Sequence, residues 1–136
     1  MNILDRQNYI SKIFKDVHKN IFDQIKGFED KSMIQDDVWH KKELGNGNSV
    51  VIDDGNFFDK AGINFSSISG KSLPESSVGN KSKSMGLPFF ATGVSVVFHP
   101  KNPYIPTAHL NVRYFCTYKT NPVSYTHLTL PTRLMV

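Results

Sequence analysis

The first 25 residues show a helical repeat of apolar positions. Charged residues fill the positions between them, and Gly27 is a residue type that commonly ends a helix. The pattern predicts one long amphipathic helix that covers a sheet, with His18 on its polar side; a helix that binds a partner protein is the less common alternative. Apolar side chains recur every three or four residues, at Ile3, Ile10, Ile13, Phe14, Val17, Ile21 and Ile25.

Strand patterns follow the acidic pair Asp36–Asp37, which is predicted to be a turn. Ser49–Asp53 is predicted to be a short strand, because it is rich in β-branched residues. Asp54–Asn56 has the composition of a hairpin turn, and Phe57–Ile68 is predicted to be the returning strand. Gly62, inside that strand, indicates a bulge or a close approach of another group.

Two more strands are predicted in the second half, after a serine- and glycine-rich loop at 69–86. They are Phe89–His99 and Ala108–Lys119, and the proline-rich segment 100–107 between them is predicted to be a loop. A period of two places alternate side chains on opposite faces, so one face joins a core and the other is polar. The polar set of the last strand is His109, Asn111, Arg113, Thr117 and Lys119; the apolar set is Ala108, Leu110, Val112, Tyr114 and Cys116.

The polar face of these two strands is the candidate site. If the strands pair, Ser95 and His99 lie near His109, Asn111 and Arg113. An arginine binds a carboxylate through two parallel hydrogen bonds, and a histidine transfers protons near neutral pH. The alternative is a polar face that only meets water, as antiparallel sheets often have. The histidine, asparagine and arginine set favours a pocket.

Composition narrows the class of protein. The chain has 136 residues, 39% of them hydrophobic, which indicates one folded domain and excludes a disordered tail. The net charge is +4, but residues 1–60 carry 9 basic and 11 acidic side chains whereas residues 61–136 carry 7 and 1. The basic second half suits an anionic ligand, or it is balanced by the acidic first half or by acidic sequence elsewhere.

Location and redox setting follow from what the sequence lacks. One cysteine, Cys116, excludes an internal disulfide, and its place on an apolar strand face indicates a core residue. No apolar run is long enough for a membrane span, and the first residues do not resemble a signal peptide. We expect a soluble, cytoplasmic protein.

Two long motifs carry a resemblance to a known family. Gly93–Phe115 closely resembles the signature of the oxygen-dependent coproporphyrinogen III oxidases, and Phe58–Ser66 resembles that family's phenylalanine-acid-lysine-alanine-glycine block. The resemblance covers roughly residues 8–120. It departs at Trp39–Asn48, where the family has an arginine and four consecutive glycines. Here Lys41 lacks the bidentate geometry of an arginine.

The resemblance implies an α+β fold, with this chain as the N-terminal part of a large antiparallel sheet flanked by helices, in a homodimer. It implies oxidative decarboxylation of two propionates of coproporphyrinogen III to vinyl groups, which gives protoporphyrinogen IX in haem biosynthesis. Molecular oxygen is the electron acceptor, carbon dioxide and peroxide leave, and no redox cofactor is required.

The resemblance also implies roles for individual residues. Ser95 and the Asn111-Val112-Arg113 run would contact substrate, and His109 would be the acid/base residue. Where descriptions of the family include a divalent metal, His99 and His109 would be ligands, with further ligands elsewhere.

The chain is predicted to divide at residue 121. Residues 1–121 are expected to be the N-terminal portion of one oxidase-like domain, and residues 122–136 a foreign tail that offers no matching strand. We therefore expect the chain by itself to be an inactive fragment. Two other classes stay open: a non-catalytic module that binds a polycarboxylate or tetrapyrrole, and a basic nucleic-acid-binding domain. Scattered basic residues and the lack of a recognised motif argue against the latter.

Overall fold

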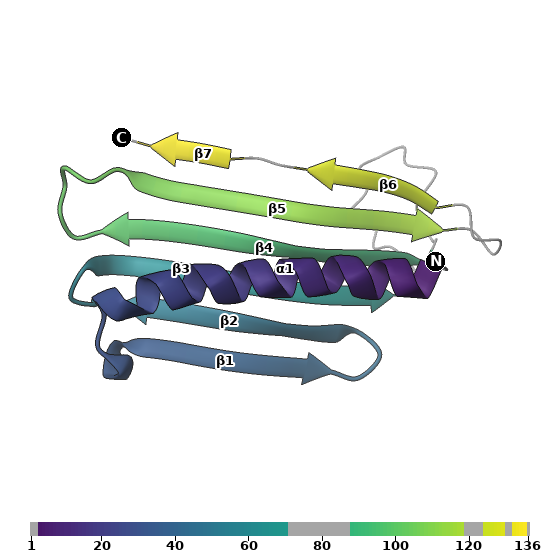
Figure 1. Cartoon of the computed structure of the whole chain (residues 1–136), viewed down its shortest axis with the longest axis horizontal. Helices are drawn as coiled ribbons and strands as arrows, with labels where there is room; N and C mark the ends of the chain where they lie inside the picture. Colours follow the sequence, from purple (N-terminus) through teal and green to yellow (C-terminus); the bar gives the residue numbers. More distant parts are fainter. Residues whose placement is uncertain (1–2, 71–87, 119–123, 130–131, 136) are drawn as a thin grey trace.

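One helix and an antiparallel sheet make two layers (Figure 1). The computed structural model describes residues 3–70, 88–118, 124–129 and 132–135. Within them, no helix is long and apolar enough to cross a membrane. Helix α1 is Ile3–Ile25, followed by short 3₁₀ turns at Lys26–Phe28 and Lys31–Met33. The strands are β1 (Ile34–Lys41), β2 (Gly45–Asp53), β3 (Phe58–Gly70), β4 (Phe89–Pro100), β5 (Thr107–Tyr118), β6 (Ser124–Thr129) and β7 (Thr132–Met135).

The sheet runs in chain order from β1 to β6, and every pairing is antiparallel, with β7 also pairing β5. This confirms the α+β class. The apolar stripe of α1 packs on β3 and β4 through Ile10, Phe14, Ile21 and Ile25. Ile13 and Val17 are exposed, so the predicted stripe was too wide. The placement of His18 on the polar side of the helix was wrong. Its side chain is 3% exposed, and Nε2 lies 2.9 Å from the Ile63 carbonyl oxygen.

The hairpin of β2 and β3 is confirmed, but β2 begins at Gly45 and a further strand precedes it. Asp36 and Asp37 belong to this edge strand, β1, and not to a turn. Its apolar signal is weak because an edge strand needs few buried side chains; Val38 is 78% exposed. The prediction of a bulge or a close approach at Gly62 was also wrong. Pairing is regular there, a Cβ would meet no atom within 4 Å, and the irregularity lies between Phe58 and Lys60.

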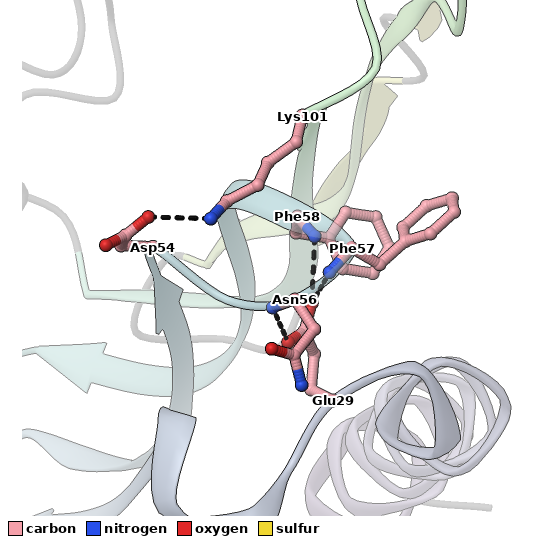
Figure 2. Close-up of polar contacts among 6 residues, drawn as sticks. All are labelled: Glu29, Asp54, Asn56, Phe57, Phe58 and Lys101. Carbon is pink, nitrogen blue, oxygen red and sulfur yellow. Dashed lines mark hydrogen bonds and ion pairs between the residues drawn. The ribbon is translucent and has the colours of Figure 1, made fainter.

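A buried carboxylate holds the turn between β2 and β3 (Figure 2). Glu29, just after α1, accepts the backbone N–H groups of Asn56, Phe57 at 2.7 Å and Phe58 at 2.8 Å. Burial raises the pKa of Glu29, but these three hydrogen bonds outweigh it and lower the pKa below its usual value. A Cβ at Gly55 would collide with this carboxylate. The end of the helix is thus tied to the turn.

The next loop joins the same end of the sheet. Lys101 Nζ lies 2.8 Å from Asp54 Oδ1, and the Lys101 N–H donates to the Phe57 carbonyl oxygen at 2.9 Å. The Lys101 ammonium, by hydrogen bond and by charge, lowers the pKa of Asp54. The β2–β3 turn and the β4–β5 loop are therefore fixed to one another.

The tail forms strands, which corrects the prediction that it offers none. β6 and β7 both pair with β5, so β5 is not an unpaired edge. Threonine and tyrosine favour strands, and both strands begin after a proline of the tail instead of containing one. In the predicted loop at 69–86, Ser69 and Gly70 belong to β3, and the rest lies outside the described residues.

Candidate functional site

The two faces of the sheet differ. Helix α1 lies over β3 and β4 on one face, where buried residues such as Ile63, Val94 and Cys116 form the core (Figure 1). No helix of the described chain lies over the other face, which we call the open face; Phe89 and Thr117, at one end of it, are nevertheless buried. Because strand side chains alternate, it receives the residues between those core positions.

A row of polar side chains crosses the open face. Ser49 of β2 pairs with Asn64 of β3, Asn64 pairs with Ser95 of β4, and Ser95 pairs with Asn111 of β5. Neighbouring strands lie about 4.8 Å apart, so the four residues span roughly 14 Å. Hydroxyl and amide groups supply both donors and acceptors along this line. The predicted pair Ser95 and Asn111 is therefore together, within a longer row.

Two histidines lie on one side of this polar row. The His99 and His109 ring centroids are 5.4 Å apart, and the rings meet edge to face. His109 Nε2 is buried and has no hydrogen-bond partner among the described residues. Such an atom is uncommon in folded proteins, and it marks His109 as a candidate site residue. The predicted histidine pair is thus brought together.

Arg113 lies on the other side of the polar row, opposite Gly93. Its side chain is exposed, and the same line of pairs continues through Ser66 and Gly47 to Trp39. Arg113 is four positions along β5 from His109, or roughly 13 Å. The site is therefore wide and has a cationic group at one end and imidazoles at the other.

The floor of the open face is made of small residues near its middle. A Cβ at Gly62 would meet no atom within 4 Å, which means that open space lies above this position. At Gly93, in contrast, a Cβ would lie 2.4 Å from the Val112 carbonyl oxygen, so the close approach of β4 and β5 requires glycine. The open face therefore has free space at Gly62 and a closely packed backbone at Gly93.

One predicted site residue lies elsewhere. The Val112 side chain is half-buried against the core on the helix-covered face, so it does not join Ser95, Asn111 and Arg113. Only its backbone is near the open face.

The two histidines do not complete a metal site within the described chain. A catalytic zinc ion takes three protein ligands, and the described residues include no three histidine, cysteine or acidic side chains placed so that they could hold a metal ion.

Three features of the site were missed from the sequence: Ser49, Asn64 and the open space at Gly62. Ser49 and Asn64 lie next to the apolar residues of the two predicted hairpin strands. Because side chains alternate between the two faces of a strand, both are placed on the polar face of the hairpin. The pairing that joins them depends on the length of the turn, which the sequence pattern did not give.

Sequence comparison assigns this sheet to a class of enzymes. A profile described as coproporphyrinogen III oxidase matches residues 9–128, most of the chain. The chain belongs to the coproporphyrinogen III oxidase family.

Curated relatives agree with this family. The chain is 44% identical over 96 residues to the oxygen-dependent coproporphyrinogen-III oxidase of Prochlorococcus marinus strain MIT 9515, covering 71% of the chain and 28% of the relative. It is 45% identical over 91 residues to the enzyme of the same name from strain AS9601, covering 67% of the chain and 27% of the relative. The chain thus spans just over a quarter of the length of these relatives.

Proposed function

We propose that the open face binds coproporphyrinogen III, and that a protein of the relatives' length converts two of its propionates to vinyl groups there. The observation that carries this proposal is the polar row across four strands, on a face over which no described helix lies. The names of the relatives indicate this substrate and oxygen. The 136-residue chain is expected to hold the ligand without turning it over.

Charge and shape support this ligand. Coproporphyrinogen III carries four carboxylates around a broad ring, and residues 61–136 have 7 basic side chains and 1 acidic. Arg113 and Lys60 place cations on the open face, on either side of the floor at Gly62. A guanidinium holds a carboxylate by two hydrogen bonds, which orients as well as attracts it.

The proposed reaction consumes one oxygen molecule for each propionic acid side chain. The carboxyl carbon leaves as carbon dioxide, and a hydrogen leaves the carbon next to the ring. Two electrons and two protons reach oxygen, which leaves as hydrogen peroxide. In this scheme Arg113 holds a carboxylate, Ser95 and Asn111 orient the substrate by hydrogen bonds, and His109 transfers a proton at Nε2. Val112 contributes through its backbone.

Filling the open space at Gly62 tests where the ligand binds. The variant Gly62→Val is expected to weaken binding of coproporphyrin III, the stable oxidised form, at least tenfold. The new side chain would stand on the floor of the site, while valine is favoured in a strand and should not lower stability. Fluorescence titration and thermal unfolding measure the two effects. The control is Gly27→Val, because a Cβ there also meets no atom within 4 Å, at the end of the helix. Equal affinity in both variants would place the ligand elsewhere.

Replacing Arg113 by lysine tests the carboxylate contact. Arg113→Lys keeps the charge but loses the paired hydrogen bonds, so binding should weaken by about 1–3 kcal/mol. The same titration measures it, with Lys60→Arg as a control that changes the other cation of this face without removing charge. An unchanged dissociation constant in Arg113→Lys would remove this residue from the site.

The second candidate is a non-catalytic module that binds a tetrapyrrole or other polycarboxylate. The same polar row favours it, because hydrogen bonding alone suffices to hold a ligand. Oxygen consumption separates the two: a full-length protein that binds coproporphyrinogen III but takes up no oxygen is the module.

We further propose that the working enzyme is a cytoplasmic homodimer. Light scattering of the full-length protein would test its oligomeric state, and cell fractionation would test its location.

A further inference from the structure

Ser49 and Asn64 are joined by a hydrogen bond on the open face. The Ser49 hydroxyl donates to Asn64 Oδ1 at 2.7 Å, between two residues that pair directly across β2 and β3. Asn64 is exposed, and a hydrogen bond in contact with water adds little to the stability of the fold. Its effect is on orientation, because it holds the amide oxygen toward Ser49 and the amide NH₂ away from it.

The Asn64 NH₂ group has no acceptor among the described residues. Its next neighbour in the row is Ser95, where the predicted site begins. An amide NH₂ offers two N–H donors, which a carboxylate oxygen accepts. On the far side of Ser49 the row ends at Asp37, whose negative charge would repel a carboxylate. A carboxylate on this row is therefore favoured at Asn64 and disfavoured beyond Ser49.

We propose that Asn64 binds a carboxylate of the ligand through its NH₂ group, and that Ser49 is a positioning residue that acts through Asn64. This inference rests on the proposed function and extends the site from β4 and β5 to β3 and β2. The ligand then lies across four strands, with Arg113 and Asn64 holding different carboxylates.

The test is titration of the 136-residue chain with coproporphyrin III. Asn64→Ala is expected to weaken binding about tenfold, because one hydrogen bond to a charged group is lost. Ser49→Ala should weaken it by a smaller factor, about threefold, whereas Ser49→Thr keeps a hydroxyl and should bind like the unchanged chain. Ser67→Ala is the matched control, because it removes a half-buried hydroxyl from the opposite face of β3.

A charge at this position gives a second measurement. Asn64→Asp should weaken binding more than Asn64→Ala, and added salt should reduce that extra loss because it screens the repulsion between carboxylates. Unchanged affinity in Asn64→Ala, equal losses in Ser49→Thr and Ser49→Ala, or an extra loss that salt leaves unaltered would each overturn the inference. A chain that binds no porphyrin at all would overturn the proposed function together with it.

Discussion

Replacing His109 by alanine is expected to lower turnover about 10²–10⁴-fold in a full-length enzyme that carries this segment. That range is typical for the loss of a general acid or base. His109 is the residue of choice because it lies beside the polar row and its buried Nε2 has no hydrogen-bond partner in the part of the chain that the structure describes. Turnover is measured as product formed and oxygen consumed, at a substrate concentration that saturates the variant.

The control for this experiment is His40→Ala. His40 is exposed on the edge strand β1, so its loss should change turnover by less than about twofold. His18 is unsuitable as a control because it is buried and its ring contacts the Ile63 carbonyl oxygen, so its loss would disturb the core. Similar turnover in His109→Ala and His40→Ala would refute the acid/base role.

Replacing Glu29 by glutamine should lower the free energy of unfolding by about 2 kcal/mol at pH 7. Three charge-assisted hydrogen bonds become neutral, and the new NH₂ group of the amide cannot accept the N–H that a carboxylate oxygen accepts. Urea unfolding of the chain and of the variant gives the difference. Asp30→Asn is the matched control; it is an exposed neighbouring carboxylate with one long contact, 3.3 Å to Asn56 Nδ2, and should change stability by less than about 0.5 kcal/mol.

The effect of Glu29 should depend on pH in a known direction. Its pKa is lower in the folded chain than in the unfolded one, where a glutamate titrates near about 4.3. Its contribution is therefore complete above the unfolded-state pKa and is lost as pH falls through the folded-state pKa. The difference in the free energy of unfolding between the unchanged chain and Glu29→Gln should become smaller below about pH 4.3. A difference in the free energy of unfolding that stays constant down to pH 3 would contradict this account.

The sequence predicted those parts of the fold whose periodicity is strong. Helix α1 and the alternating strands β4 and β5 were predicted close to their observed bounds. The burial of His18 was within reach of the same pattern, because it lies four residues after Phe14 and three before Ile21, on the apolar stripe. The edge strand β1 could not be predicted from the pattern, because acidic residues occupy positions that are apolar in an inner strand.

The pairing of Ser49 with Asn64 could not be predicted because it depends on the turn between β2 and β3. The predicted turn at Asp54–Asn56 would place Asp53 opposite Phe57 and Ser49 opposite Ala61, three residues from its observed partner Asn64. The observed turn lies later in the chain: the Gly55 N–H donates to the Phe58 carbonyl oxygen at 2.9 Å, and the Glu29 carboxylate accepts the N–H groups of residues 56–58. The displaced turn goes with a contact from a distant residue, which local turn composition could not reveal. Ser95, Asn111 and Arg113 were found together because their alternation along two strands needs no such contact.

The alternation of the strands also separates two kinds of change in the sequence. Every second position of β2, β3, β4 and β5 supports the core, and the positions between them form the open face. A substitution on the open face at a position such as Ser95 or Asn111 alters what the sheet can bind without removing a buried apolar contact. Descendants of this chain could therefore acquire a preference for a different carboxylated ligand through such substitutions, while the fold keeps its stability.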